Sequence, residues 1–461
     1  MSVEVITLGC RLNLAESATM RALAAAEDDL VIVNSCAVTN EAVRQTRQAV
    51  RRAKRARPEA RVIVTGCAAQ VEPESFAAMP EVSRVIGNAG KLEADAFLSP
   101  SPLWGGVGVG VRSHGERAAL RAAPPTLPSP TRGEEKFSSL PVSAERSRAF
   151  LGVQSGCDHR CTFCIIPYGR GPSRSAPAGA IVERIKALVD EGCLEVVLTG
   201  VDVTSYGPDL PGAPTLGGLI ARILRHVPDL PRLRLSSLDC IELDARLFEI
   251  AAYEPRFMPH LHMSFQSGDD MILKRMKRRH SRSQAIEIVQ RLKAARPEIA
   301  IGADLIAGFP TETEKMHENS LRLIDECDVV MGHIFPYSPR QGTPAARMPQ
   351  VAPEIRKARA QALRQASARR KSAWLKSLVG TRQRVLMERN GLGHTENFAP
   401  VSLNPTRSSR AKSRDPLERS REQVGLDSAR QCVSTSLDMS GSVVKVSIQS
   451  STPDTLIGVP A

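Results

Sequence analysis

The sequence of 461 residues predicts an α/β protein with an N-terminal parallel-sheet domain, a partial (β/α)6 barrel and a small C-terminal β-barrel. Two observations predict this class. Short apolar runs alternate with helix-like stretches over residues 3–97 and again over 150–347, as in parallel sheets with crossover helices. Short strand-like runs then follow Gly380, which favours a separate β domain.

The first predicted domain spans residues 1–98 and is Rossmann-like. Its buried parallel strands are expected at Val3–Leu8, Leu30–Val33, Val62–Val64 and Val82–Ile86. Cys10, Cys36 and Cys67 each follow one of the first three strands. Because ligands collect at the carboxyl ends of parallel strands, we expect these three thiols to converge there.

Residues 99–143 interrupt this pattern. Glycine and proline make up 12 of the 35 residues in 99–133, against 64 of 461 in the whole chain. Such a segment buries too little apolar surface to offset the entropy lost on ordering. We therefore expect a disordered insertion that links two domains.

The second predicted domain spans residues 144–377 and is a partial TIM-like barrel followed by a long basic helix at 351–377. Its six strands are expected at Phe150–Val153, Glu195–Leu198, Arg232–Leu235, His260–Phe265, Ile299–Asp304 and Val329–Phe335. Helices are expected between them, for example at Ala180–Asp190 and Ser283–Ala295. The active site of such a barrel lies at the carboxyl ends of its strands.

Residues 378–461 form the last predicted domain. Its strand-like runs are Arg382–Met387, Val443–Ile448 and Thr455–Val459, and an Arg- and Ser-rich insertion at about 402–440 interrupts them. Residues 351–461 hold 19 Lys and Arg against 9 Asp and Glu, which is most of the chain's net charge of +13. This excess suits a polyanionic partner.

The ten cysteines carry the strongest chemical signal. No export signal or membrane span is evident in the sequence, so we expect reduced thiols that hold metal rather than disulfides. Cys157, Cys161 and Cys164 share a short loop and can reach adjacent irons of one 4Fe-4S cluster, leaving its fourth iron open. Zinc is the alternative, but it needs a fourth ligand, and His159 inside the loop is poorly placed. No ligand role is expected for Cys193, Cys240, Cys327 and Cys432.

These motifs resemble the radical S-adenosylmethionine enzymes, specifically their methylthiotransferase branch. The resemblance covers the chain except for its two insertions. It is carried by the cysteine loop with Tyr168–Gly171 after it, and by Thr7–Asn13, Asn34–Thr39 and Thr65–Gln70. It implies that Cys157, Cys161 and Cys164 hold a 4Fe-4S cluster that binds and cleaves S-adenosylmethionine (SAM). It also implies that Cys10, Cys36 and Cys67 hold an auxiliary 4Fe-4S cluster that carries the sulfur to be transferred.

The resemblance also suggests SAM-binding residues. Gly200 and Asp202 match a family segment that contacts the SAM amino group, although an Asp there often simply caps a helix. Ser264, Gln266 and Ser267 are expected to donate hydrogen bonds to substrate or ribose, with ordinary loop polarity as the alternative. Gly308 resembles a loop glycine that permits close approach of the cofactor. The chemistry lies at the clusters, so no side chain is expected to act as a catalytic acid or base.

The predicted substrate is RNA. Two basic clusters, within residues 44–57 and 274–282, suggest phosphate contacts, although such runs are often only solvated faces. The C-terminal β domain resembles the RNA-binding TRAM barrel of the family. Four segments resemble the bacterial branch specific for threonylcarbamoyladenosine, namely Gly9–Asn13, Cys36–Ala42, Gly200–Val203 and Leu273–His280.

We therefore predict a cytoplasmic, monomeric enzyme that converts N6-threonylcarbamoyladenosine at position 37 of the tRNA anticodon stem-loop to its 2-methylthio derivative. The reaction also needs an electron donor that the sequence does not identify. The alternatives are a methylthiotransferase acting on isopentenyladenosine or on a ribosomal protein. An alternative of another class is a non-catalytic iron–sulfur or zinc protein that binds tRNA.

Overall fold

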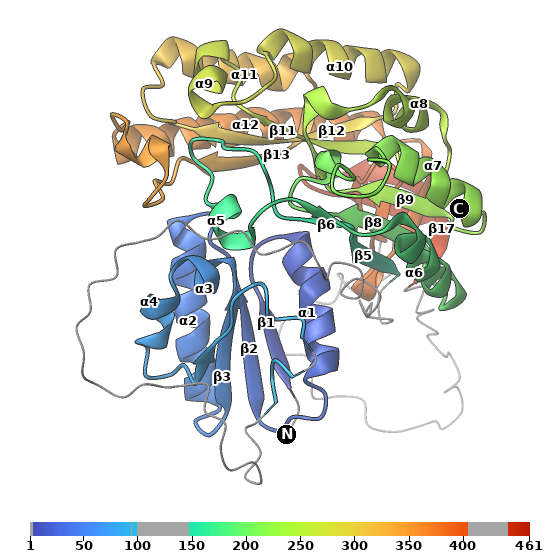
Figure 1. The fold of residues 1–461 in the computed structure, drawn as a ribbon. Coiled ribbons are helices and arrows are strands. Elements are labelled where there is room, and N and C mark those ends of the chain that lie inside the picture. The colour runs from blue at the N-terminus through green and yellow to red at the C-terminus, as the bar shows by residue number, and fades with distance from the viewer. Residues whose placement is uncertain (1–2, 94, 99–146, 404–440) are drawn as a thin grey trace, which may run out of the picture.

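The computed structural model describes residues 3–93, 95–98, 147–403 and 441–461, which form three bodies in chain order (Figure 1). The insertion expected at 99–143, nearly all of the one at about 402–440, and Cys432 lie outside the described residues. None of the helices described combines the length and the apolar character that crossing a membrane requires.

The N-terminal body is a parallel sheet with strand order β1-β2-β3-β4. Its strands are β1 (Glu4–Thr7), β2 (Leu30–Ser35), β3 (Arg61–Gly66) and β4 (Arg84–Val85). Helices α1 (Arg11–Leu23) and α2 (Asn40–Ala56) cover opposite faces, and the short helices α3 (Cys67–Val71) and α4 (Pro73–Ala77) lie on the side of α2 (Figure 1). Successive residues of β2 enter two different apolar cores, which explains why the strand is an uninterrupted apolar run.

Six parallel strands form the second body, a partial barrel, as predicted. They are β5 (Arg148–Gly152), β8 (Glu195–Thr199), β9 (Arg232–Leu235), β11 (His260–Gln266), β12 (Ala300–Ala307) and β13 (Val329–Pro336). Strand β9 is followed after one residue by β10 (Ser237–Leu238), which pairs with β11 and so joins the two halves of the barrel. Among the described pairings none joins β5 to β13, so the barrel is incomplete.

The barrel helices lie outside the strands. They are α6 (Ala178–Asp190), α7 (Leu216–His226), α8 (Ala245–Tyr253), α10 (Arg282–Ala295), α11 (Glu314–Glu326) and α12 (Pro353–Ser377). Short elements occupy the carboxyl ends of the strands: β6 (Gln154–Ser155), β7 (Arg174–Ser175), α5 (Ile166–Arg170), α9 (Asp270–Met276) and the 3-10 turns Val203–Ser205, Cys240–Glu242 and Pro344–Arg347. Side-chain hydrogen bonds cap the N-terminal ends of several of these helices. For example, the Ser281 hydroxyl and the Gln284 side chain form a reciprocal capping box at α10.

Side chains alternate between the two faces of the barrel strands. On β12, Ala303 and Leu305 join the apolar core beneath the helices, so Asp304 points to the inside of the barrel. His262 on β11 and His333 on β13 have the same inward direction, because their neighbours along the strands belong to that core. The inner face is therefore polar at this level.

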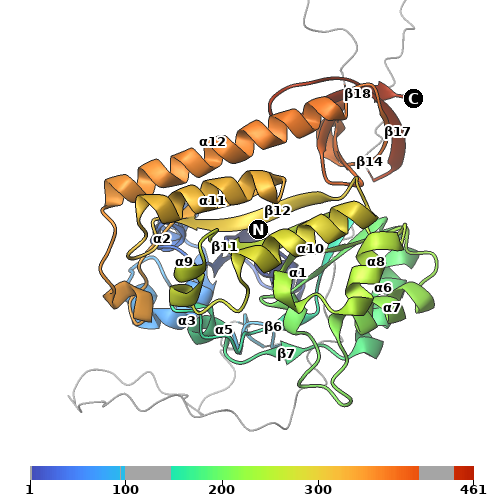
Figure 2. The same ribbon diagram turned by 90° about the horizontal axis from the view of Figure 1, so that it is seen from above.

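The C-terminal body is a closed β-barrel with strand order β14-β15-β16-β18-β17. Its strands are β14 (Arg382–Met387), β15 (Leu392–Thr395), β16 (Pro400–Leu403), β17 (Val443–Ser451) and β18 (Leu456–Pro460). Figure 2 shows α12 running along the partial barrel and ending at this body. The sequence prediction missed β15 and β16, which are only four residues long and lack an apolar run.

The C-terminal barrel is anchored to the starts of strands of the partial barrel. Arg232 and Arg234 on β9 donate hydrogen bonds to the backbone carbonyls of Thr395 and Glu396. The ring of Phe398, in the same turn, stacks on His260 of β11 at a centroid distance of 5.1 Å. This contact leaves the carboxyl ends of the strands free for the N-terminal body.

Candidate active site

The sheet topology brings together the first cysteine triad. Cys10 directly precedes α1, Cys36 follows β2, and Cys67 begins α3. A Cβ atom added to Gly9 would lie 2.8 Å from the Cys36 sulfur, so the loop of Cys10 lies directly against Cys36. The convergence predicted from the strand ends is therefore present.

The second triad occupies one loop after β6. The backbone N–H of Cys157 donates to the Gly171 carbonyl, and the N–H of Thr162 donates to the Met276 carbonyl at the end of α9. Cys164 follows through a turn in which its N–H donates to the Cys161 carbonyl. Both ends of the loop are thus fixed by backbone contacts, independently of any ligand.

The sulfur positions separate a cluster from a single zinc ion. Thiolates around one tetrahedral zinc lie about 3.8 Å apart, given Zn–S bonds of about 2.3 Å. Neither cysteine triad is among the described groups of three ligand atoms within 4.8 Å of one another, which are Cys157–His159–Asp202, Asp239–Cys240–His280 and His262–Asp304–His333. Each triad is therefore too widely spread for one zinc ion, whereas a cubane binds each thiolate on a different iron.

Burial keeps several of these thiols protonated in the absence of metal. It raises the pKa of Cys36 to about 11 and the pKa of both Cys157 and Cys164 to about 12. Metal ligation requires thiolates, so loading of these residues must release protons.

The two triads face each other across the interface between the N-terminal body and the barrel. A Cβ atom added to Gly169 on α5 would lie 3.4 Å from the Cβ of Cys67. The side-chain amide of Asn88 donates to the Gly169 carbonyl at 2.6 Å and lies 3.7 Å from the Cys67 sulfur. The cluster motifs, about 90 residues apart in sequence, are therefore in contact.

A buried ionic cluster fixes this interface. Glu16 on α1 accepts from Lys91 at 2.6 Å and from Arg170 on α5 at 2.7 Å, and Arg170 also donates to Asn13 at 2.6 Å. The side chains of Lys91 and Arg170 are only 1% and 2% exposed. Burial alone would raise the pKa of Glu16, but the two cations outweigh it and lower the pKa to about 2.

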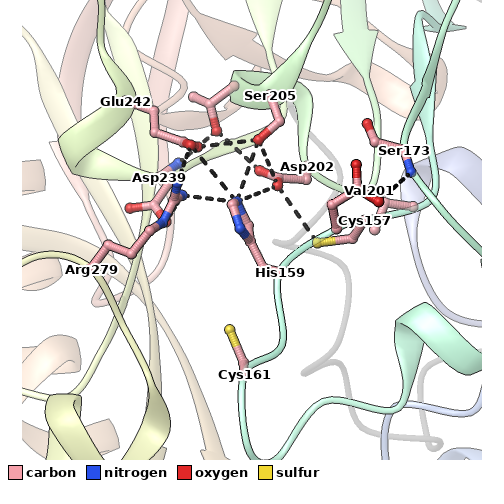
Figure 3. Close-up of polar contacts among 12 residues, drawn as sticks. Cys157, His159, Cys161, Ser173, Val201, Asp202, Ser205, Asp239, Glu242 and Arg279 are labelled. Carbon is pink, nitrogen blue, oxygen red and sulfur yellow. Dashed lines mark hydrogen bonds and ion pairs between the residues drawn. The ribbon is translucent and has the colours of Figure 1, made fainter. Parts of the chain in front are cut away.

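A second polar network surrounds the cysteine loop of the barrel. Nε2 of His159 lies 2.8 Å from the Asp202 carboxylate and 3.7 Å from Glu242, and the imidazole is directed toward these groups and away from Cys161 (Figure 3). Hydrogen bonds to Asp202 and then Glu242 raise the pKa of His159 to about 10. Asp202 and Glu242 thus hold the His159 imidazole, which also lies near the Cys157 sulfur. That His159 completes no zinc site stays a prediction.

The predicted Asp202 lies beside the cysteine loop. One carboxylate oxygen lies 3.6 Å from the Cys157 sulfur and accepts from the Ser205 hydroxyl at 2.9 Å. Burial would raise the pKa of Asp202, but the hydrogen bond from His159 outweighs it, so the pKa is lowered and the group is ionised. Its contact with the SAM amino group stays a prediction.

Gln154 on β6 is a site residue that the sequence reasoning missed. Its side-chain carbonyl accepts from the backbone N–H groups of Val201 and Asp202 at 3.0 and 2.9 Å. Its amide donates to the Gly156 carbonyl at 2.8 Å. A Cβ atom at Gly200 would lie 2.8 Å from this side chain, so that glycine gives room to Gln154. Gln154 therefore fastens the loop of Asp202 to the start of the cysteine loop.

The remaining predicted SAM contacts have other observed environments. The Ser264 carbonyl accepts from Arg278, and Gln266 ends β11 at a bulge with a φ of 63°. A Cβ atom at Gly308 would lie 2.4 Å from Arg356 of α12, so this glycine permits close approach of a helix. The structure thus gives a different reason for Gly308 from the one expected, and its role toward the cofactor stays a prediction.

Much of the basic surface expected to bind RNA is used within the protein. Arg278 donates to Asp239 and lies 3.7 Å from the Cys161 sulfur, and Arg279 pairs with Glu242. Acidic residues of the N-terminal body pair with Arg44, Arg47 and Arg51 on α2, and with Arg57 directly after it. The basic runs in the sequence gave no indication of these acidic partners, most of which lie elsewhere in the chain.

Two family models match the chain. Residues 151–324 match the Radical SAM superfamily, and residues 2–87 match the Uncharacterized protein family UPF0004. Threonylcarbamoyladenosine tRNA methylthiotransferase MtaB of Rickettsia prowazekii is 49% identical, over 87% of this chain and 91% of that protein. The protein of the same name from Aquifex aeolicus is 33% identical, over 87% and 96%. A tRNA-2-methylthio-N(6)-dimethylallyladenosine synthase of Erythrobacter litoralis is 33% identical, over 84% and 86%.

The radical SAM match covers the second cysteine triad, the UPF0004 match covers the first, and the relatives extend over nearly their whole length. The chain therefore belongs to the radical SAM family of tRNA methylthiotransferases.

Proposed function

We propose that this protein transfers a methylthio group to C2 of N6-threonylcarbamoyladenosine at position 37 of tRNA. The observation that carries the proposal is the juxtaposition of two three-cysteine sites, Cys10, Cys36 and Cys67 facing Cys157, Cys161 and Cys164. Two adjacent sites suit a reaction in which one centre generates a radical and the other supplies sulfur. The substrate follows from the relative that is 49% identical over most of both chains.

Each triad is proposed to hold one 4Fe-4S cluster, with SAM bound at the triad of the barrel. When bound, these groups would supply the reductive cleavage of SAM and the sulfur for transfer. The wide spacing of the sulfur atoms supports clusters over zinc, and the three protein ligands in each triad leave one iron for an exchangeable ligand. An external reductant is still required.

The protein's own residues orient and shield this chemistry. Gln154 holds the Asp202 loop against the cysteine loop, which supports the prediction that Asp202 binds the SAM amino group. Arg278 places a guanidinium 3.7 Å from the Cys161 sulfur. We retain Gly200, Ser264, Gln266 and Gly308 as proposed contributors to the SAM-binding surface.

The proposed RNA partner is the anticodon stem-loop, and a tRNA substrate would place a monomeric enzyme in the cytoplasm. In the described structure, Arg52 and Arg55 on α2 and Lys274 and Lys277 near α9 are basic residues without an acidic partner. These residues can contact phosphates, and binding through them should weaken as the salt concentration rises.

Mass spectrometry of tRNA nucleosides tests the proposal. A strain lacking the gene should accumulate threonylcarbamoyladenosine, and the wild-type gene should restore its 2-methylthio derivative. The Cys157→Ala variant, expressed at a matched level, should not restore it. Restoration of only the methylthio derivative of isopentenyladenosine would reject the proposed substrate, and restoration by Cys157→Ala would reject radical chemistry.

A further inference from the structure

Arg11 brings an unusual charge into the catalytic barrel. It directly follows Cys10, and its helix α1 packs against strand β5. The guanidinium carbon lies 5.8 Å from the ring centre of Phe150 on β5 and 5.9 Å from that of Phe398. Within the described chain no carboxylate forms an ion pair with Arg11, and its guanidinium lies over these two aromatic rings.

Arginines of β5 and β9 surround the buried carboxylate of Glu195 on β8. The side chains of Arg148, Arg232 and Arg234 all contact the same carboxylate, that of buried Glu195. Glu195 is therefore fully engaged by three cations. Arg148 also pairs with Glu388 at 2.7 Å, so among these four arginines Arg11 is the one without a described carboxylate partner. An anion beside Arg11 would supply that partner.

The inner face of β11, β12 and β13 contributes a second potential partner beside Asp304, whose charge attracts Arg11. His262, Asp304 and His333 come from adjacent strands, and both imidazoles contact the same carboxylate oxygen, at 3.0 and 3.3 Å. Asp304 therefore contacts two imidazoles, and it forms no described ion pair with Arg11. The side chain of His333 is 59% exposed on the inner face of β13, so it is accessible from inside the barrel.

From this arrangement we infer that Arg11 and His333 form the subsite that binds the free carboxylate of the threonylcarbamoyl group. The inference rests on the proposed function, because the adenine must reach both cysteine triads and Arg11 adjoins one of them. A carboxylate can form a charge-assisted hydrogen bond with the guanidinium of Arg11, and it can accept a hydrogen bond from an imidazole N–H of His333. A dimethylallyl group is apolar and would bury Arg11 without a partner, so the subsite also selects between the two modified adenosines.

Binding of three synthetic anticodon stem-loop RNAs to the cluster-loaded enzyme tests the subsite. The RNAs carry threonylcarbamoyladenosine, its neutral methyl ester, or isopentenyladenosine, and fluorescence anisotropy measures each Kd. Wild type should prefer the acid over the ester by about 10- to 100-fold, since the ester removes the charge and keeps the shape. Arg11→Met and His333→Asn should each reduce this ratio toward one, and Arg11→Lys should restore part of it.

Arg55→Gln is the matched control for loss of one positive charge. Arg55 lies exposed on α2, so this variant should weaken all three RNAs equally and keep the ratio. Measurements of iron content and SAM cleavage verify that each variant is folded and loaded with clusters. If Arg11→Met fails to load clusters, His333→Asn alone must lower the preference for the acid over the ester. Equal binding of acid and ester by wild type, or an unchanged ratio in both variants, overturns the inference. Failure of wild type to methylthiolate the acid-bearing RNA instead overturns the proposed function.

Discussion

The two cysteine triads are built in different ways. Cys157, Cys161 and Cys164 lie within eight residues of one loop, whereas Cys10, Cys36 and Cys67 span 58 residues and follow three separate strands. The geometry of the barrel loop depends mainly on local backbone contacts. The geometry of the Cys10, Cys36 and Cys67 triad depends on the register of a whole sheet. Two independently built sites need a separate device to hold them together, and the buried Glu16 cluster is that device.

Replacing one cysteine in each triad should have the largest effects on activity and should separate the roles of the two triads. Cys157→Ala should abolish both SAM cleavage and methylthiolation. Cys36→Ala should abolish methylthiolation but keep SAM cleavage, because its triad belongs to the other body. Each variant should lose about half of the iron after anaerobic reconstitution, as expected for one of two cubane sites.

Cys327→Ala is the matched control. This cysteine is buried and lies outside both triads, so the variant should keep all of the iron and both activities. Loss of SAM cleavage in Cys36→Ala at full occupancy of the barrel cluster would contradict the division of roles.

Breaking the link between the two sites should cost stability. Glu16→Gln leaves the buried cations Lys91 and Arg170 uncompensated, so the free energy of unfolding should fall by about 3–5 kcal/mol at pH 7. The pKa of Glu16 in the folded protein is lowered to about 2, below its ordinary value of 4.5. Its stabilising effect is therefore complete above pH 4.5 and is lost as the pH falls toward 2.

Denaturant unfolding of wild type and Glu16→Gln between pH 7 and pH 3 measures this dependence. The difference in the free energy of unfolding between wild type and Glu16→Gln should become smaller below pH 4.5. A constant difference over the whole range would show that the carboxylate charge does not stabilise the interface.

The sequence predicted features that are local or periodic. Apolar runs located the six barrel strands, and their ends placed Cys10 and Cys36 at one sheet edge. Contacts between distant residues were not predictable, because nothing in the sequence pairs Glu16 with Arg170, which lies 154 residues away. Gln154 was missed because a lone amide in a short strand carries no periodic signal.

Loosening the barrel loop should affect SAM more than stability. Gln154→Leu removes the acceptor shared by the N–H groups of Val201 and Asp202, and it frees the start of the cysteine loop. We expect KM for SAM to rise about tenfold, as one or two hydrogen bonds are lost. Gln154→Glu keeps the acceptor and should recover part of the affinity. An unchanged KM in both variants would mean that the loops are held without this side chain.

The smallest expected effect concerns Gly308, for which sequence and structure give different reasons. Its φ of 68° and its contact with Arg356 predict that Gly308→Ala destabilises the protein by about 1–2 kcal/mol through backbone strain and crowding of α12. If helix packing is the whole reason for the glycine, Gly308→Ala leaves the Kd for SAM unchanged. Adding Arg356→Ala to this variant then restores the part of the unfolding free energy that was lost to crowding, while the part lost to backbone strain stays lost. Calorimetry and SAM binding on the single and double variants measure both quantities. A weaker Kd for SAM at unchanged stability would instead favour the role expected from the sequence, because only a cofactor close to the added methyl group would respond in that way.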